Sequence, residues 1–96
     1  RVMFPSDRST NPVWCFSVFA APEVSVTPRV LGEFAKRNLV PTRFEAVVDG
    51  DDLSIVVQVA GMDEQVAAHV AEVLRGLFHV ERVLMTTKTL AQEARA

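Results

Sequence analysis

The pattern of apolar and polar positions divides the chain into six segments with the periods of strands or helices. Residues 13–20 are almost continuously apolar and rich in β-branched and aromatic side chains, which is typical of a strand central in its sheet. Residues 42–48 and 53–60 alternate around an Asp-Gly step that favours a hairpin turn. Residues 80–85 are predicted to form the last strand.

Two segments between these strands have the period of amphipathic helices. The first is predicted to begin at Thr27-Pro28, because a residue before proline stays extended, as at an N-cap, and proline is favoured in the first turn. It should end near Asn38, which can adopt the left-handed conformation, and the second should follow Asp63 as N-cap. The side chains predicted to face the sheet are Val30, Leu31, Phe34 and Ala35 in the first helix and Val66, Val70, Val73, Leu74 and Leu77 in the second.

This order of segments is a repeated β-α-β unit. Right-handed crossovers then give a four-stranded antiparallel sheet with both helices on one face. We therefore predict an α+β chain with a ferredoxin-like βαββαβ two-layer sandwich. The length of 96 residues allows one such core. We expect a flexible N-terminal arm at 1–12, one domain at 13–86, and a helical or frayed C-terminal tail at 87–96.

The sheet face opposite the helices is predicted to carry a mixture of apolar and polar side chains. Such a mixture is too apolar for a freely solvated face and too polar for an ordinary core. We therefore expect an oligomer interface on this face, while a sheet edge and coverage by the C-terminal tail remain alternatives. Alternation assigns to this face Cys15, Ser17, Phe19, Arg43, Glu45, Val47, Ser54, Val56 and Gln58, and to the helix side Phe44, Ala46, Val48, Ile55, Val57 and Val59.

Composition narrows the class of protein. With 49% hydrophobic and 23% charged residues, the chain has enough apolar surface to fold as a globular domain. A net charge of -2 provides no basic field for nucleic acid. The longest apolar stretch falls short of the ~20 residues that cross a bilayer, and no signal-peptide pattern is present. Because the chain opens at Arg1 rather than Met, we expect it to be a piece of a longer protein.

Candidate chemistry is sparse. The single cysteine, Cys15, can form neither an internal disulfide nor a multi-cysteine metal site, and it suits a cytoplasmic location. His69 and His79 have no partner that the sequence identifies. The acidic residues around Gly50 lack the spacing of a calcium loop. We therefore predict that the chain is not an enzyme and holds no cofactor and no metal.

Residues 29–39, RVLGEFAKRNL, resemble the first helix of ACT domains, in particular that of the small regulatory subunits of acetolactate synthase. There the pattern R-V-(I or L)-G-x-F-(S or A)-x-R leads into the second strand. The similarity extends in pattern over residues 13–86 and includes VAGMD at 59–63. ACT domains typically bind amino acids or other small ligands at a dimer interface and so control an attached or partner enzyme. The resemblance thus implies an ACT-like regulatory domain, with acetolactate synthase as the candidate partner.

The same resemblance places a ligand site in the loop before the first helix, where the regulatory subunits carry N-x-x-G-x-L. Pro22, Ser25 and Thr27 stand at the asparagine, glycine and leucine, and serine adopts positive φ less readily than glycine. The helix start can still receive a carboxylate through hydroxyls and backbone N–H groups near Arg29 and Val30. Simple helix capping and ligand binding both remain open. The residues expected to bind the ligand are Glu23, Val24, Ser25, Val26, Thr27, Arg29 and Val30.

A purely structural dimerisation or interaction module without ligand binding is the alternative function. In either case we expect a homodimer and no binding to nucleic acid or membrane. The regulatory function adds a small amino-acid ligand and a catalytic partner subunit or fused enzyme. Protection of the loop before the first helix by a specific ligand would distinguish the two.

Overall fold

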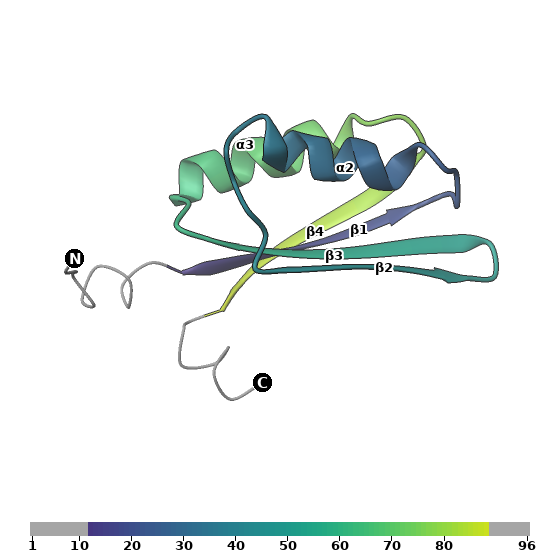
Figure 1. The fold of residues 1–96 in the computed structure, drawn as a ribbon, viewed down its shortest axis with the longest axis horizontal. Helices are drawn as coiled ribbons and strands as arrows, with labels where there is room; N and C mark the ends of the chain where they lie inside the picture. The colour runs from purple at the N-terminus through teal and green to yellow at the C-terminus, as the bar shows by residue number, and fades with distance from the viewer. Residues whose placement is uncertain (1–11, 89–96) are drawn as a thin grey trace.

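The computed structural model describes residues 12–88. Its elements are β1 Val13–Ala20, α2 Val26–Ala35, β2 Arg43–Asp49, β3 Asp52–Ala60, α3 Glu64–Arg75 and β4 Val80–Lys88. The strands form one antiparallel sheet in the order β2-β3-β1-β4, and Figure 1 shows both helices on one side of it. The predicted ferredoxin-like βαββαβ fold is confirmed.

The two terminal segments fall largely outside the described residues. β4 runs to Lys88, so the last strand extends into the segment predicted as a tail at 87–96. The predictions for the N-terminal arm, and for coverage of the open sheet face by the tail, lie outside what the structure describes.

The core lies between the sheet and the helices. β1 is paired with β3 on one side and β4 on the other, and Phe16 and Val18 of β1 are fully buried. The Phe16 ring meets that of Phe34 from α2 edge-on, with 5.4 Å between centroids. Trp14 donates its indole N–H to the Met62 carbonyl at 2.7 Å, which fastens the start of β1 to the turn before α3.

The first helix begins earlier than the sequence pattern predicted. Ser25 is the N-cap and Val26 the first helical residue, so the predicted start at Thr27-Pro28 is wrong by two positions. Pro28 is therefore the third helical residue, where a missing N–H is harmless because the first four N–H groups have no intrahelical partner. At the other end, Asn38 has φ 61°, as predicted for a left-handed helix end.

The buried face of α2 also differs from the prediction. Leu31 is 41% exposed and Ala35 is exposed, whereas Glu33 is buried. A carboxylate can take this position because Arg37 lies 2.9 Å and Lys36 3.1 Å from its oxygens. The buried residues of the helix are Val26, Val30, Glu33 and Phe34.

In α3 the predicted start is confirmed, since Asp63 caps the helix by accepting the Val66 N–H at 2.9 Å. Val66 itself was predicted to face the sheet but is 40% exposed. Two alanines, Ala67 and Ala71, lie on the buried face of the helix instead. The buried residues of α3 are Ala67, Val70, Ala71 and Leu74.

The edge strand β2 is poorly covered by the helices. Phe44 packs against the core, but Ala46 is exposed and Val48 is 62% exposed, although all three were predicted to face the helices. α3 packs on β1 and β4, and β4 is the edge strand opposite to β2. Beyond Phe44, the helix-facing side of β2 is therefore exposed to solvent.

Candidate functional site

The predicted ligand loop connects β1 to α2 and contains a turn that two backbone hydrogen bonds stabilise. The Glu23 N–H donates to the Ala21 carbonyl at 2.8 Å, and the Val26 N–H donates to the Glu23 carbonyl at 3.1 Å. Val24 is 94% exposed at the tip, while Val26 and Val30 have their side chains in the core. Those two valines can therefore reach a ligand only through their backbone.

The helix start offers fewer hydrogen-bond donors than expected. Because α2 begins at Val26, the Arg29 N–H donates to the Ser25 carbonyl at 3.3 Å, and the Val30 N–H belongs to the helix. These two N–H groups are therefore engaged within the helix and are not available to a ligand in this conformation. Ser25 makes no side-chain capping bond, so its hydroxyl is not a cap either. The hydroxyls of Ser25 and Thr27, both half-buried, and the Thr27 N–H remain for an anion.

The connection between α3 and β4 lies beside this loop. The Ala21 N–H donates to the His79 carbonyl at 3.1 Å. The rings of Phe78 and His79 lie 4.0 Å apart, and Phe78 is 69% exposed. His79 is half-buried, and His69, on α3, is exposed.

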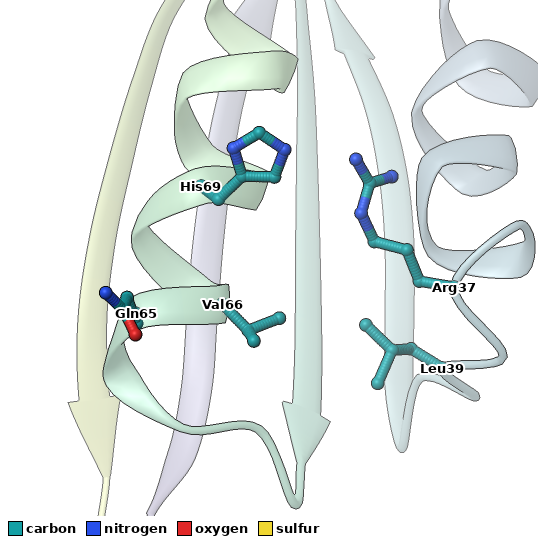
Figure 2. A pocket seen from close by; sticks show the side chains of 5 residues that line it. All are labelled: Arg37, Leu39, Gln65, Val66 and His69. Carbon is teal, nitrogen blue, oxygen red and sulfur yellow. The ribbon is translucent and has the colours of Figure 1, made fainter.

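A hollow that sequence analysis missed lies between the end of α2 and the start of α3. It has a volume of about 370 Å³ and is lined by Arg37, Leu39, Gln65, Val66 and His69. In Figure 2 the Leu39 and Val66 side chains face each other, and the Arg37 guanidinium extends towards the level of the His69 ring. The two halves of the hollow lie far apart in the chain, so no local pattern marks it. The sequence offered one indirect signal, which is that Val66 lies at the edge of the apolar stripe of its helix.

Arg37, which lines this hollow, belongs to an ion-pair network at the end of α2. Arg37 donates through Nη1 to the Glu33 carbonyl at 2.7 Å and to Glu33 Oε1 at 2.9 Å, while Lys36 Nζ lies 3.1 Å from Glu33 Oε2. The hydrogen bond from Arg37, opposed by burial and aided by Lys36, lowers the pKa of the Glu33 carboxyl below its usual value. Two cations thus share one carboxylate, so the cluster of Glu33, Lys36 and Arg37 has one net positive charge.

The open sheet face has fewer exposed apolar side chains than predicted. The Arg82 guanidinium lies 4.4 Å from the centre of the Phe19 ring, and both Phe19 and Val56 are half-buried. Gln58, predicted to lie on this face, is 4% exposed. Within residues 12–87, the exposed large apolar side chains on this face are Val47 and Leu84, at 57% and 49%.

The described residues contain no group of three or more His, Cys, Asp or Glu side chains placed to hold a metal ion. Within the same part of the chain, neither helix has the length and apolar character needed to span a membrane.

Comparisons with known proteins identify this architecture. A model of ACT-like domains matches residues 7–92. The chain is similar in structure to the ACT domain of a GTP pyrophosphokinase from Chlorobium tepidum, with a TM-score of 0.71 and 10% identity over 80% of this chain and 100% of that one. It is also similar to the C-terminal domain of the MgtC protein from Mycobacterium tuberculosis, with a TM-score of 0.68 and 13% identity over 85% and 93%.

A third solved structure contains the same fold within a longer chain. A homoserine dehydrogenase from Thiobacillus denitrificans matches with a TM-score of 0.65 and 11% identity, over 83% of this chain but 18% of that one. No curated protein sequence matches the chain. At these identities the structural likeness establishes the fold alone.

Proposed function

The chain belongs to the ACT-like domain family, and from this premise we propose that it is a non-catalytic regulatory domain that self-associates and binds a small amino-acid ligand to control a partner enzyme. The sequence RVLGEFAKRNL at 29–39 makes acetolactate synthase the candidate partner. The free, half-buried Cys15 is consistent with the cytoplasm as the compartment.

One observation carries the self-association. β2 is an edge strand, and two adjacent valines on it, Val47 and Val48, are 57% and 62% exposed on opposite faces of the sheet. An edge of this kind is a template for pairing with another strand. Among the described residues, the open sheet face supports association less well, because Phe19 is already covered by Arg82. We therefore propose the β2 edge as the dimer contact.

The charges of β2 favour one pairing register. An antiparallel copy centred on Ala46 pairs all 7 residues of the strand and keeps both faces of the sheet continuous. Arg43 then lies opposite Asp49 of the partner subunit, at both ends of the contact. A register shifted by two residues in one direction places Glu45 opposite Glu45 of the partner subunit, and a shift in the other direction places it opposite Asp49 of the partner subunit. Both registers are disfavoured, because like charges directly opposite each other on paired strands are destabilising.

Charge exchange tests this contact. Arg43→Asp should raise the dimer dissociation constant about tenfold or more, because two attractive pairs become repulsive. The double variant Arg43→Asp/Asp49→Arg should restore the wild-type value, as measured by sedimentation over a concentration series. Phe19→Glu and Val56→Lys, on the open face, are the controls and should leave the dimer intact. A wild-type monomer at every concentration would rule out self-association, and dissociation by the face variants alone would move the contact to the open face.

Ligand binding is tested by titrating valine, leucine and isoleucine while following backbone amide shifts. We expect weak binding, with dissociation constants between about 10 µM and 1 mM. Few backbone donors remain at the start of α2, because Pro28 has no N–H and the Arg29 N–H already donates to the Ser25 carbonyl. Shifts should be confined to residues 22–30 and a facing subunit, and the same amino acid should change the activity of a purified acetolactate synthase catalytic subunit in the presence of the chain. An intact dimer with no shifts at millimolar concentrations would favour the purely structural dimerisation module.

A further inference from the structure

We propose that the hollow between α2 and α3 is a second binding site, which takes a small organic acid with an apolar body and no ammonium group. It lies at the end of α2 opposite to the predicted ligand loop, since Arg37 and Leu39 follow the helix whereas residues 23–27 precede or begin it. This proposal does not depend on ligand binding at the loop.

The size and walls of the hollow suit such a ligand. Its volume of about 370 Å³ lies within the range of small-molecule pockets, about 300–1,000 Å³. Leu39 is held in place by its N–H bond to the Phe34 carbonyl at 2.9 Å, directly after the left-handed Asn38. Val66 faces Leu39 (Figure 2) and is 40% exposed, so an apolar body between them would remove apolar surface from water.

The charge of the hollow selects an anion. Both hydrogen bonds of Arg37 to Glu33 use Nη1, and the remaining guanidinium N–H groups have no partner among residues 12–88. Glu33 fixes the position of the guanidinium but is itself shared with Lys36. A carboxylate at the mouth of the hollow would therefore accept a charge-assisted hydrogen bond from a pre-positioned donor. The His69 ring and the Gln65 amide, which also line the hollow, can add further hydrogen bonds.

The same residues discriminate against amino acids. None of the five lining residues is acidic, and both carboxylate oxygens of Glu33 are engaged, at 2.9 Å and 3.1 Å. An α-ammonium group entering the hollow would lose water without gaining a carboxylate partner. We therefore expect a carboxylate without an ammonium group to bind more tightly than an amino-acid zwitterion of the same shape.

A titration with four compounds tests this assignment. Phenylacetate should shift the amides of residues 37–39 and 65–69 in a saturable manner. Phenylacetamide, which lacks the charge, and phenylglycine, which adds the ammonium, should bind about tenfold more weakly. Acetate, which lacks the apolar body, should not saturate. Equal shifts from phenylacetate and phenylacetamide, no shifts from phenylacetate, or equal affinity for phenylglycine would overturn the proposal.

Two arginine variants separate the ligand contact from a general loss of charge. Arg37→Gln should weaken phenylacetate binding about tenfold. The matched control is Arg75→Gln, because Arg75 also pairs with a glutamate of the preceding helical turn, Glu72 at 2.8 Å, but is not part of the hollow. Wild-type binding by Arg37→Gln, or an equal loss in both variants, would refute the contact. If Arg37→Gln fails to fold, Val66→Ser should reduce the phenylacetate affinity instead.

The outcome is distinguishable from that of the proposed regulatory function. Amino acids that shift residues 22–30, combined with silence of phenylacetate at 37–39 and 65–69, would remove this second site and leave the first. The opposite pattern would retain the hollow and remove amino-acid binding at the loop.

Discussion

Replacing Phe34 with alanine should lower the free energy of unfolding by about 3–5 kcal/mol. Phe34 is fully buried, and its ring packs edge-on against Phe16 across the layer boundary. Truncation removes both the buried ring and its partner contact and leaves a cavity between α2 and β1. Because a domain of this size is stable by about 5–15 kcal/mol, the loss is a large share of the total. Urea denaturation followed by circular dichroism measures it.

Leu31→Ala is the control, because Leu31 lies three positions earlier on the same helix and is 41% exposed. Its replacement should change stability by well under half of the Phe34→Ala effect, since less apolar surface leaves water on folding. A larger loss for Leu31→Ala than for Phe34→Ala would show that α2 is rotated about its axis relative to this structure.

Trp14→Ala should also cost about 3–5 kcal/mol, and Trp14→Phe should show how much of that is the hydrogen bond. Trp14 is 6% exposed, and its indole N–H donates to the carbonyl of the buried Met62. Phenylalanine keeps most of the apolar contact but leaves that carbonyl without its donor, at an expected cost of about 1–3 kcal/mol. The same denaturation experiment applies to both variants.

A Trp14→Phe variant as stable as the wild type would mean that water replaces the indole N–H at the Met62 carbonyl. The bond would then contribute nothing to holding the start of β1 against the turn before α3. Equal losses for Trp14→Phe and Trp14→Ala would instead assign the whole effect to the hydrogen bond.

Several features of the fold followed from local chemistry that the sequence displays. The Asp-Gly step predicted the β2–β3 hairpin, and Gly50 has φ 64° there because the turn requires a conformation that glycine adopts without strain. Asp63 was predicted as the cap of α3 because a carboxylate can accept an N–H at a helix start. The alternation of Ile55, Val57 and Val59 predicted the buried side of β3, since strand residues alternate between faces.

Other features depended on partners distant in the chain. Glu33 was not among the residues predicted to face the sheet, and its burial is made tolerable by its ion pairs with Arg37 and Lys36. Val48 has the alternation of a buried residue, but β2 lies at the sheet edge, beyond the cover of the helices. Periodicity identifies which face a side chain lies on, and only packing decides whether that face is covered.

The candidate sites divide in the same way. The candidate loop before α2 was predicted from the resemblance to ACT domains, whose matching residues are contiguous in the sequence, but the count of usable donors depended on a helix start at Val26 rather than at Thr27-Pro28. The hollow joins Arg37 and Leu39 to Val66 and His69, which no local pattern connects. The sequence by itself therefore determined the elements and their order, since these depend on short-range preferences. The tertiary structure alone decided which surfaces meet across the two helices and which edge stays exposed, because those depend on contacts between distant residues.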